Sequence, residues 1–210
     1  MNNKIFYIMG KSGSGKDTMF KYLTDKLCKD YITVREGINP LRPIIMNTTR
    51  PMRDGEINGQ NYNFVSEETM HDDSAHNKII ECRKYDTVKG EWYYYTSKDS
   101  IDLEKYSYIG LGTPVSFNQL GKVYGNSLVP IMLSVEDNER FLRLVEREKE
   151  FTKPDYLELC RRFVSDESDF SVEKVRSLVP CDIMVSFENV DQNGCCMALY
   201  DYIIKTLKNN

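Results

Sequence analysis

A glycine-rich segment near the N-terminus constrains the fold of this chain more than any other feature. It runs from Gly10 to Lys16, reads Gly-Lys-Ser-Gly-Ser-Gly-Lys and has the spacing G-x-x-x-x-G-K. A short run of β-branched and aromatic residues at 4–9 precedes it, and apolar residues at helical spacing follow it. These apolar residues are Met19, Phe20, Leu23 and Leu27. The pattern predicts a strand, a tight loop and a helix in succession.

The loop has the composition of a phosphate cradle. Glycines let the backbone wrap closely around an anion, so that several N–H groups point at one polyphosphate. The start of the following helix adds free N–H donors, and Lys16 can bridge the β- and γ-phosphates. A plain Gly/Ser turn is the alternative, but the strand before and the helix after favour a phosphate loop. The predicted ATP-binding residues are Gly10, Lys11, Ser12, Gly13, Ser14, Gly15, Lys16, Asp17 and Thr18.

The residue after Lys16 departs from the usual motif. Phosphate loops commonly have Ser or Thr there, whose hydroxyl holds Mg²⁺, whereas this chain has Asp17 and reaches Thr18 one residue later. We predict Mg²⁺ as the cofactor that enters with ATP. Its candidate protein ligands are Asp17 and Thr18, acting directly or through water.

The rest of the chain alternates between strand and helix patterns. Helices are predicted near 115–123, over 136–149 with Phe141, Leu142, Leu144 and Val145 facing inward, and from Pro154 onward. Such alternation indicates an α/β fold of the P-loop NTPase type, with a mostly parallel sheet flanked by helices. Residues 50–96 break the rhythm and are predicted to form an inserted, largely antiparallel flap. Further strands are predicted at 43–46, 78–82, 106–111, 128–135 and 181–187.

The flap contains a long motif, Thr-Thr-Arg-Pro-Met-Arg-Asp-Gly-Glu-Ile-Asn-Gly-Gln-Asn-Tyr-Asn-Phe-Val-Ser at residues 48–66. Arg50 and Arg53 offer two planar forks for one monophosphate, and Tyr62 can donate a further hydrogen bond. The motif resembles the guanylate kinase signature T-T-R-x-x-R-x-G-E-x-x-G-x-x-Y-x-F. The resemblance implies a clamp for the acceptor phosphate, with Glu56 bracing the arginines. An exposed charge network is the alternative interpretation.

Further acceptor contacts follow from the resemblance. Glu81 matches a family carboxylate that accepts hydrogen bonds from the guanine N–H and amino groups, a task suited to a side chain that only accepts. The run Trp-Tyr-Tyr-Tyr-Thr at 92–96 makes Tyr93 a candidate phosphate contact and Thr96 a candidate base contact. The predicted GMP-binding residues are Arg50, Arg53, Glu56, Tyr62, Glu81, Tyr93 and Thr96.

Phosphoryl transfer needs cations around the moving group. The predicted catalytic residues are Lys16, Arg143, Arg147 and Arg162, the last in a helix that resembles the one after the family's lid. Pairing of these arginines with glutamates on an exposed helix is the alternative. Arg140 and Arg161 are predicted to lie on the surface. One domain, 1–210, is expected, with a core of about 1–47, 97–146 and 157–210, a flap of about 48–96 and a lid of about 147–156.

The chain also departs from the family. Gly110 and Gly112 stand where aspartates are usual, and Met46 stands where a serine commonly reads guanine. Lys11 replaces a proline, and Ser-Phe-Glu at 186–188 takes the place of Asn-Asp after the last strand. Guanine selectivity is therefore open.

Composition bounds the remaining possibilities. A net charge of −4 argues against nucleic acid as a partner, and no run approaches the ~18 apolar residues of a membrane span. The six cysteines lack metal-ligand spacing, which indicates thiols in a reduced, cytoplasmic setting. The expected function is transfer of a phosphoryl group from ATP to GMP by a monomer or small homo-oligomer. The alternatives are a related kinase acting on ribose 1,5-bisphosphate, or a non-catalytic binding module.

Overall fold

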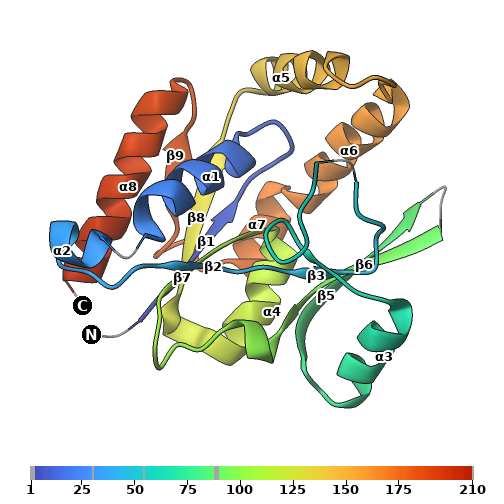
Figure 1. Ribbon diagram of the computed structural model, residues 1–210. Helices are drawn as coiled ribbons and strands as arrows, with labels where there is room; N and C mark the ends of the chain where they lie inside the picture. The colour runs from blue at the N-terminus through green and yellow to red at the C-terminus, as the bar shows by residue number, and fades with distance from the viewer. Residues whose placement is uncertain (1–2, 30, 54, 88–89, 210) are drawn as a thin grey trace.

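A computed structural model describes residues 3–29, 31–53, 55–87 and 90–209. At its centre lies a five-stranded sheet, ordered β2-β7-β1-β8-β9, in which every pairing is parallel (Figure 1). The parallel arrangement brings the carboxyl ends of these strands to one edge, where ligands bind in open α/β sheets. The strands are β1 (Ile5–Met9), β2 (Arg42–Pro43), β7 (Tyr108–Gly112), β8 (Leu128–Ser134) and β9 (Val185–Glu188).

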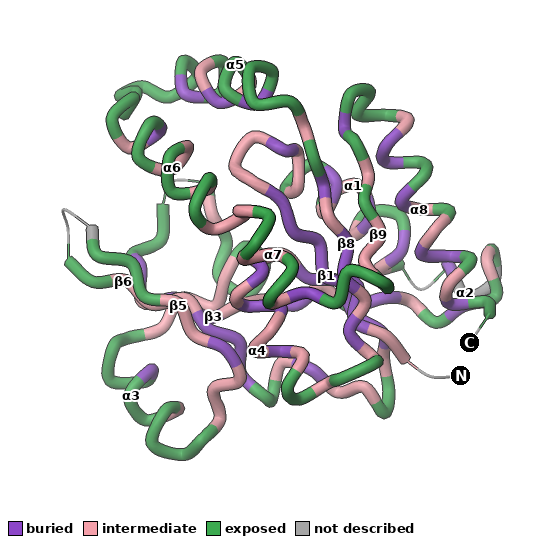
Figure 2. The backbone as a smooth tube through the Cα atoms, turned by 180° about the vertical axis from the view of Figure 1, so that it is seen from behind, coloured by how far each residue is buried: buried purple, intermediate pink, exposed green. Residues whose placement is uncertain are grey.

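Helices cover both faces of this sheet. On one face, α1 (Lys16–Leu27) and α8 (Gln192–Lys208) enclose a core built around Phe6, Ile8 and Ile131. On the other face, α4 (Pro114–Tyr124) and α7 (Val172–Leu178) enclose a core around Ile5, Tyr7 and Met9. All of β1 is buried because helices pack on both of its sides, which explains why it reads as a continuous apolar run (Figure 2).

The inserted flap forms a second sheet, ordered β4-β3-β6-β5. Its β5–β6 and β3–β6 pairings are antiparallel and its β3–β4 pairing is parallel, so the sheet is mixed. Helix α3 (Glu67–Ala75) begins at Ser66, whose hydroxyl accepts a hydrogen bond from the Thr69 N–H. The strands are β3 (Asn47–Thr48), β4 (Asn63–Phe64), β5 (Ile79–Thr87) and β6 (Gly90–Ser97).

Two further helices, α5 (Asp137–Lys149) and α6 (Tyr156–Asp169), lie beyond the carboxyl ends of the central strands (Figure 1). Both are exposed along much of their length, as Figure 2 shows. The short helix α2 (Ile32–Glu36) lies beside α8, and the Tyr200 hydroxyl donates to the Glu36 carboxylate at 2.8 Å. None of the helices in the described residues combines the length and apolar character that a bilayer span needs.

The α/β prediction is confirmed, including the parallel central sheet and the inserted sheet. Several details differ. Phe141 and Leu142 were predicted to face inward from α5, but their exposed fractions are 36% and 58%, because only one narrow stripe of α5 meets the loop and α6. The predicted strand at 43–46 is reduced to Arg42–Pro43, because the chain then leaves the central sheet to enter the flap.

Candidate active site

The glycine-rich loop is shaped by its glycines and by the side chains packed against it. Gly13 and Gly15 have φ angles of 82° and 89°, a left-handed conformation that favours glycine. A Cβ atom on Gly13 would lie 2.7 Å from the carbonyl oxygen of Arg140, and one on Gly15 would collide with the Asn189 amide. The loop therefore follows a path that other residues could not take.

Lys16 begins α1 at the end of this loop. Its ammonium donates to the Lys11 carbonyl oxygen at 2.9 Å, so the side chain folds back over the loop. Burial lowers the pKa of Lys16, a shift opposed by the nearby carboxylates of Asp17 and Asp166. The loop thus holds a partly desolvated cation that a phosphate would stabilise.

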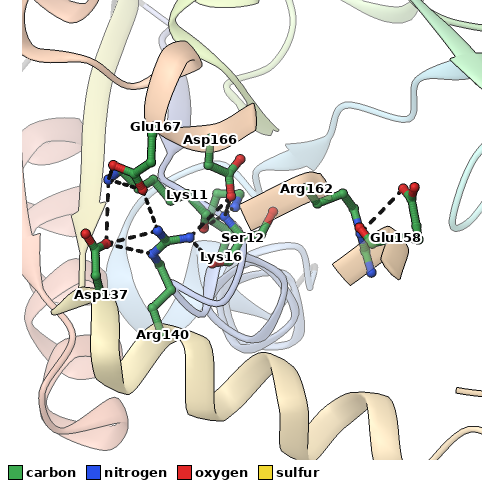
Figure 3. Close-up of polar contacts among 9 residues, drawn as sticks. All are labelled: Lys11, Ser12, Lys16, Asp137, Arg140, Glu158, Arg162, Asp166 and Glu167. Atoms are coloured by element: carbon green, nitrogen blue, oxygen red, sulfur yellow. Dashed lines mark hydrogen bonds and ion pairs between the residues drawn. The ribbon is translucent and has the colours of Figure 1, made fainter. Parts of the chain in front are cut away.

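Arg140 was predicted to lie on the surface, and this prediction is wrong. Its side chain is 1% exposed and its guanidinium stacks over the Phe163 ring at 3.9 Å. It donates to Asp137 at 2.9 Å, to Glu167 at 2.7 Å and to the Ser12 carbonyl oxygen at 3.2 Å (Figure 3). Arg140 thereby joins α5, α6 and the phosphate loop.

Helix α6 brings two carboxylates onto the loop. The Asp166 carboxylate accepts the Ser12 N–H at 2.6 Å, and the Glu167 carboxylate pairs with the Lys11 ammonium at 2.6 Å (Figure 3). An N–H group of a phosphate loop binds anions, so the Asp166 carboxylate here occupies a position suited to a phosphate oxygen. The loop and α6 are held together by charge.

The three candidate catalytic arginines lie on α5 and α6. Arg143 pairs with Glu139 at 3.0 Å and donates to the Asn189 carbonyl oxygen at 3.0 Å, which places it beside the loop. Arg147 is exposed, makes no ion pair with another described residue, and is close enough to help lower the pKa of Lys16. Arg162 is partly exposed and donates to the Glu158 carbonyl oxygen at 3.4 Å.

The candidate metal ligands Asp17 and Thr18 are exposed on the first turn of α1. Neither side chain hydrogen-bonds to another described residue, so their oxygens are open to solvent and to a ligand. Carboxylate and hydroxyl oxygens are suitable donors for Mg²⁺. In the described residues, no group of three or more His, Cys, Asp or Glu side chains could hold a metal by itself.

The acceptor motif forms a braced arginine. Arg50 is 3% exposed, and its two terminal nitrogens donate to the two oxygens of Glu56 at 2.9 and 2.7 Å. The Glu56 carboxylate also accepts the Arg53 N–H at 2.7 Å. Hydrogen bonding to Arg50 lowers the pKa of Glu56, so this carboxylate stays charged. Glu56 therefore fixes the direction in which the Arg50 fork points.

Aromatic hydroxyls complete this end of the flap. The Tyr94 hydroxyl accepts from the Arg50 Nε at 3.1 Å, and the Tyr62 and Tyr94 rings pack edge to face with centroids 5.6 Å apart. Tyr93, the residue named from the sequence, points elsewhere and donates to the exposed Glu91 carboxylate at 3.2 Å. Alternation along β6 explains the difference, since neighbouring side chains face opposite sides. The geometry thus places Tyr94, and not Tyr93, beside Arg50.

Arg53 has an exposed side chain that faces α6. The Glu158 carboxylate on α6 has a lowered pKa, chiefly because Arg161 donates to it, and Arg53 contributes to the same shift. Asp54, which follows Arg53 in the motif, lies outside the described residues.

The other end of the flap holds a buried carboxylate. Glu81 is 1% exposed and accepts the Thr96 hydroxyl at 2.9 Å, so these two candidate base contacts lie together. A second cation, missed in the sequence, lies next to them: the Arg83 Nε is 3.3 Å from the Glu81 Oε2. Arg83 also donates to the Met46 sulfur at 2.9 Å. The signal for Arg83 was its position two residues after Glu81, on the same side of β5.

The glycines at the end of β7 are explained by Tyr7. A Cβ atom on Gly110 would lie 3.0 Å from the Tyr7 ring, and one on Gly112 would collide with the Tyr7 hydroxyl. That hydroxyl donates to the buried Ser116 at 2.8 Å. Tyr7 therefore fills the space that larger side chains would take at these two positions.

Asn189 is a further residue that sequence reasoning missed. Strand β9 runs to Glu188, so the residue that follows the last strand is Asn189 and not the earlier segment at 186–188. It is fully buried and its amide donates to the Ser14 carbonyl oxygen at 2.9 Å. The Asn189 Oδ1 and the Ser14 Oγ are buried without hydrogen-bond partners among the described residues.

Comparison with known proteins identifies the family. The sequence model of a family described as "Guanylate kinase" matches residues 2–133 of the 210-residue chain. The chain belongs to the guanylate kinase family. The match contains both the glycine-rich loop and the flap, which carry the two sequence motifs of the candidate site.

Individual relatives agree with this assignment. The guanylate kinase of Helicobacter pylori strain J99 is 33% identical over 104 residues, which cover 49% of this chain and 43% of the relative. That of Rhodopirellula baltica is 36% identical over 98 residues, which cover 47% of this chain and 41% of the relative. The alignments therefore span less than half the length of these curated relatives.

Among solved structures, a guanylate kinase from Anaplasma phagocytophilum superposes with a TM-score of 0.61 at 13% sequence identity. The superposition covers 99% of this chain and 88% of that chain. At this identity the likeness shows a shared fold. It extends over the helices beyond residue 133, where the family match ends.

The Glu56–Arg50 pair gives a pH-dependent prediction. Because the folded pKa of Glu56 lies below its ordinary value of 4.5, the pair contributes its full stability above that value and loses it as the pH falls through the folded pKa. Glu56→Gln should lower the free energy of unfolding by about 1–3 kcal/mol at neutral pH. The difference from the unmodified protein, measured in urea titrations, should shrink as the pH is lowered below 4.5. An equal difference at neutral and at acidic pH would contradict this account.

The buried position of Arg140 gives a second prediction. Arg140→Met leaves the carboxylates of Asp137, Asp166 and Glu167 without the cation that they share. It should lower the free energy of unfolding by about 3–5 kcal/mol. Arg161→Met is the matched control, because Arg161 is exposed and pairs only with Glu158 among the described residues. The control should change stability by less than about 1 kcal/mol. Chemical denaturation of both variants measures the contrast, and equal stabilities would refute the role of Arg140.

Proposed function

We propose that this protein transfers the terminal phosphoryl group of ATP to a nucleoside monophosphate, most favourably GMP. The observation that carries the proposal is the pairing of two anion sites: a loop of main-chain amides ending in Lys16, and a braced Arg50 fork. Family membership supports the reaction class. The role of each residue is inferred from its position and chemistry.

In this proposal the loop binds the donor. Main-chain N–H groups of residues 10–18 hold the β- and γ-phosphates, and Lys16 gives up its bond to the Lys11 carbonyl to reach them. The Ser12 N–H is now bound by Asp166, so this contact with α6 breaks or shifts when a phosphate arrives. Arg143, next to Asn189, lies where it can contact the rest of the nucleotide.

Mg²⁺ would enter with ATP and supply charge neutralisation at the phosphates. Asp17 and Thr18 are the residues that would hold it, directly or through water, since their oxygens are exposed at the start of α1. Tyr7 occupies the space beside Gly112, so the end of β7 provides no carboxylate to this metal.

The flap would bind the acceptor phosphate. Arg50 is already oriented by Glu56, and Tyr94 accepts from Arg50, which leaves its own hydroxyl proton free to donate. Arg53 and Tyr62 would complete the clamp. Positioning of this kind accounts for much of the catalysis in phosphoryl transfer, which needs little covalent help from the protein.

The arginines of α5 and α6 would neutralise the moving group. Among the described residues Arg147 makes no ion pair, and Arg162 makes only long contacts, to Glu158 and Glu148. Cations that are loosely held can turn toward the site as it closes. We propose that 147–156, which contains the end of α5, the start of α6 and the connection between them, acts as the lid.

A nucleotide panel with ATP and Mg²⁺ tests the reaction class and yields a prediction for Lys16. GMP, AMP, CMP, UMP and ribose 1,5-bisphosphate are offered to the protein, and product ADP is measured. Lys16→Met should lower turnover of the best acceptor by at least about 100-fold. Its melting temperature without nucleotide should not fall, because the variant removes a cation whose burial is unfavourable. Unchanged turnover in the variant would refute the donor site.

The two neighbouring tyrosines of β6 provide a matched pair of variants. Tyr94→Phe removes a hydroxyl beside Arg50 and should raise the KM for the acceptor by about 10-fold. Tyr93→Phe removes a hydroxyl on the opposite, exposed side and should leave the KM unchanged. Steady-state kinetics at saturating ATP measure both. The reverse ranking would restore Tyr93 as the phosphate contact.

A further inference from the structure

The base end of the acceptor site contains a charged pair with unused hydrogen-bonding capacity. Glu81 and Arg83 lie two residues apart on β5 and project to the same side of the flap sheet, with Thr96 and Tyr94 opposite them on β6. Tyr94 contacts Arg50 at the phosphate end, so the pair lies on the acceptor side of this sheet.

Two atoms of the pair have no hydrogen-bond partner among the residues that the structure describes. The Glu81 Oε2, an acceptor, and the Arg83 Nε, a donor, are both buried and lie side by side 3.3 Å apart, without the geometry of a hydrogen bond between them. The other Glu81 oxygen is engaged by Thr96, and one Arg83 terminal nitrogen by the Met46 sulfur. Buried polar atoms normally find partners, so an adjacent orphan donor and acceptor point to a ligand.

The ligand edge that complements this pair is a lactam. A ring N–H can donate to the Glu81 Oε2 while the adjacent ring C=O accepts from the Arg83 guanidinium. Guanine, hypoxanthine and uracil present this edge. Adenine and cytosine present an acceptor ring nitrogen beside an amino donor, which would place like groups against Glu81 and Arg83.

Charge favours a neutral ligand at this end. Arg83 carries one positive charge and Glu81 one negative charge, so the pair is close to neutral overall, and a second phosphate placed here would face the Glu81 carboxylate. A base is therefore a better occupant than the second phosphate of a sugar bisphosphate.

We propose that Arg83 is a specificity-determining residue, which reads the oxo group of a lactam base while Glu81 reads the neighbouring N–H. This inference rests on the proposed function, because it concerns the base of the acceptor nucleotide. It extends that function, because the Arg83 guanidinium supplies a hydrogen-bond donor for the base, whereas the neighbouring thioether of Met46 cannot donate.

The test is a set of acceptor analogues combined with variants at 83. GMP and IMP both carry the lactam, whereas 2-aminopurine riboside 5′-monophosphate keeps the purine and the phosphate but lacks it. The unmodified protein should favour GMP over this analogue by at least about 10- to 100-fold in kcat/KM, and should accept IMP but not AMP.

Arg83→Met keeps the length of the side chain and removes its donors. It should reduce the preference for GMP over the analogue by about 10- to 100-fold, through a higher KM for GMP and little change for the analogue. A merely structural role would weaken both acceptors alike and leave the preference intact. Arg83→Lys, which keeps the charge but loses the planar fork, should restore only part of the preference.

Arg35→Met is the matched control, because Arg35 is an exposed arginine on α2 that pairs with Glu36 and lies outside the site. It should behave as the unmodified protein. Thermal unfolding of each variant confirms that it is folded before kinetics are compared. If Arg83→Met does not fold, the preference for GMP over the analogue is compared between Arg83→Lys and the unmodified protein. A lower preference in Arg83→Lys supports the role of Arg83, and an equal preference overturns it.

The outcomes separate the two proposals. Absence of phosphoryl transfer to every monophosphate overturns the proposed function, and equal binding of GMP and the analogue by the unmodified protein in calorimetry then overturns the role of Arg83. Transfer to GMP with an unchanged preference in Arg83→Met overturns the role of Arg83 alone. Efficient use of AMP overturns it as well.

Discussion

The packing of Arg140 against the phosphate loop is the interaction on which the site depends. A glycine-rich loop has little structure of its own, because glycine restricts the backbone least of all residues. Here the loop takes one path, since the Arg140 backbone closes the space beside Gly13 and Asn189 closes the space beside Gly15. The Arg140 guanidinium then ties the same loop to α5 and α6. The cradle is thus formed before any anion is bound.

At the proposed acceptor end, an ion pair between Arg50 and Glu56 likewise fixes the position of a buried arginine. Arg50 is buried and would be costly there without a partner, and Glu56 supplies two hydrogen bonds in a plane. The pair leaves Arg50 fixed before a substrate arrives, which reduces the ordering needed on binding. The proposed donor end is arranged differently, because Lys16 donates to a carbonyl oxygen and the Ser12 N–H to a carboxylate, and a bound phosphate would replace both of these acceptors. The two ends therefore differ in how much rearrangement they require.

The resemblance to the family is weakest at Met46, Gly110 and Gly112. Met46 contacts the Arg83 guanidinium, and Tyr7 fills the space beside the two glycines. Each substitution alone reads as a loss of a family feature. Under the proposed function, the buried Glu81–Arg83 pair would contact a base edge with an adjacent donor and acceptor.

The sequence by itself determined those features that depend on local backbone chemistry. Gly13, Gly15 and Lys16 specify the loop wherever a strand precedes and a helix follows, and the motif at 48–66 identified Arg50 and Glu56 as partners before any distance was known. Hydrophobic periodicity is a local property of the sequence, so it predicted where strands and helices lie. Their alternation in turn indicated a parallel sheet.

Only the tertiary structure decided which side chains from distant segments meet. Arg140 reads as a surface residue among glutamates, and its burial follows from α6 crossing the loop with Phe163, Asp166 and Glu167. That Tyr94 and not Tyr93 lies beside Arg50 depends on the register of β6, since a shift of one residue turns a side chain to the other face. The contacts of Asn189 with Ser14 and of Arg83 with Glu81 likewise depend on how the chain folds. Sequence spacing can specify the path of the backbone. Which side chains are buried, and which of them contact one another, depends on the tertiary packing.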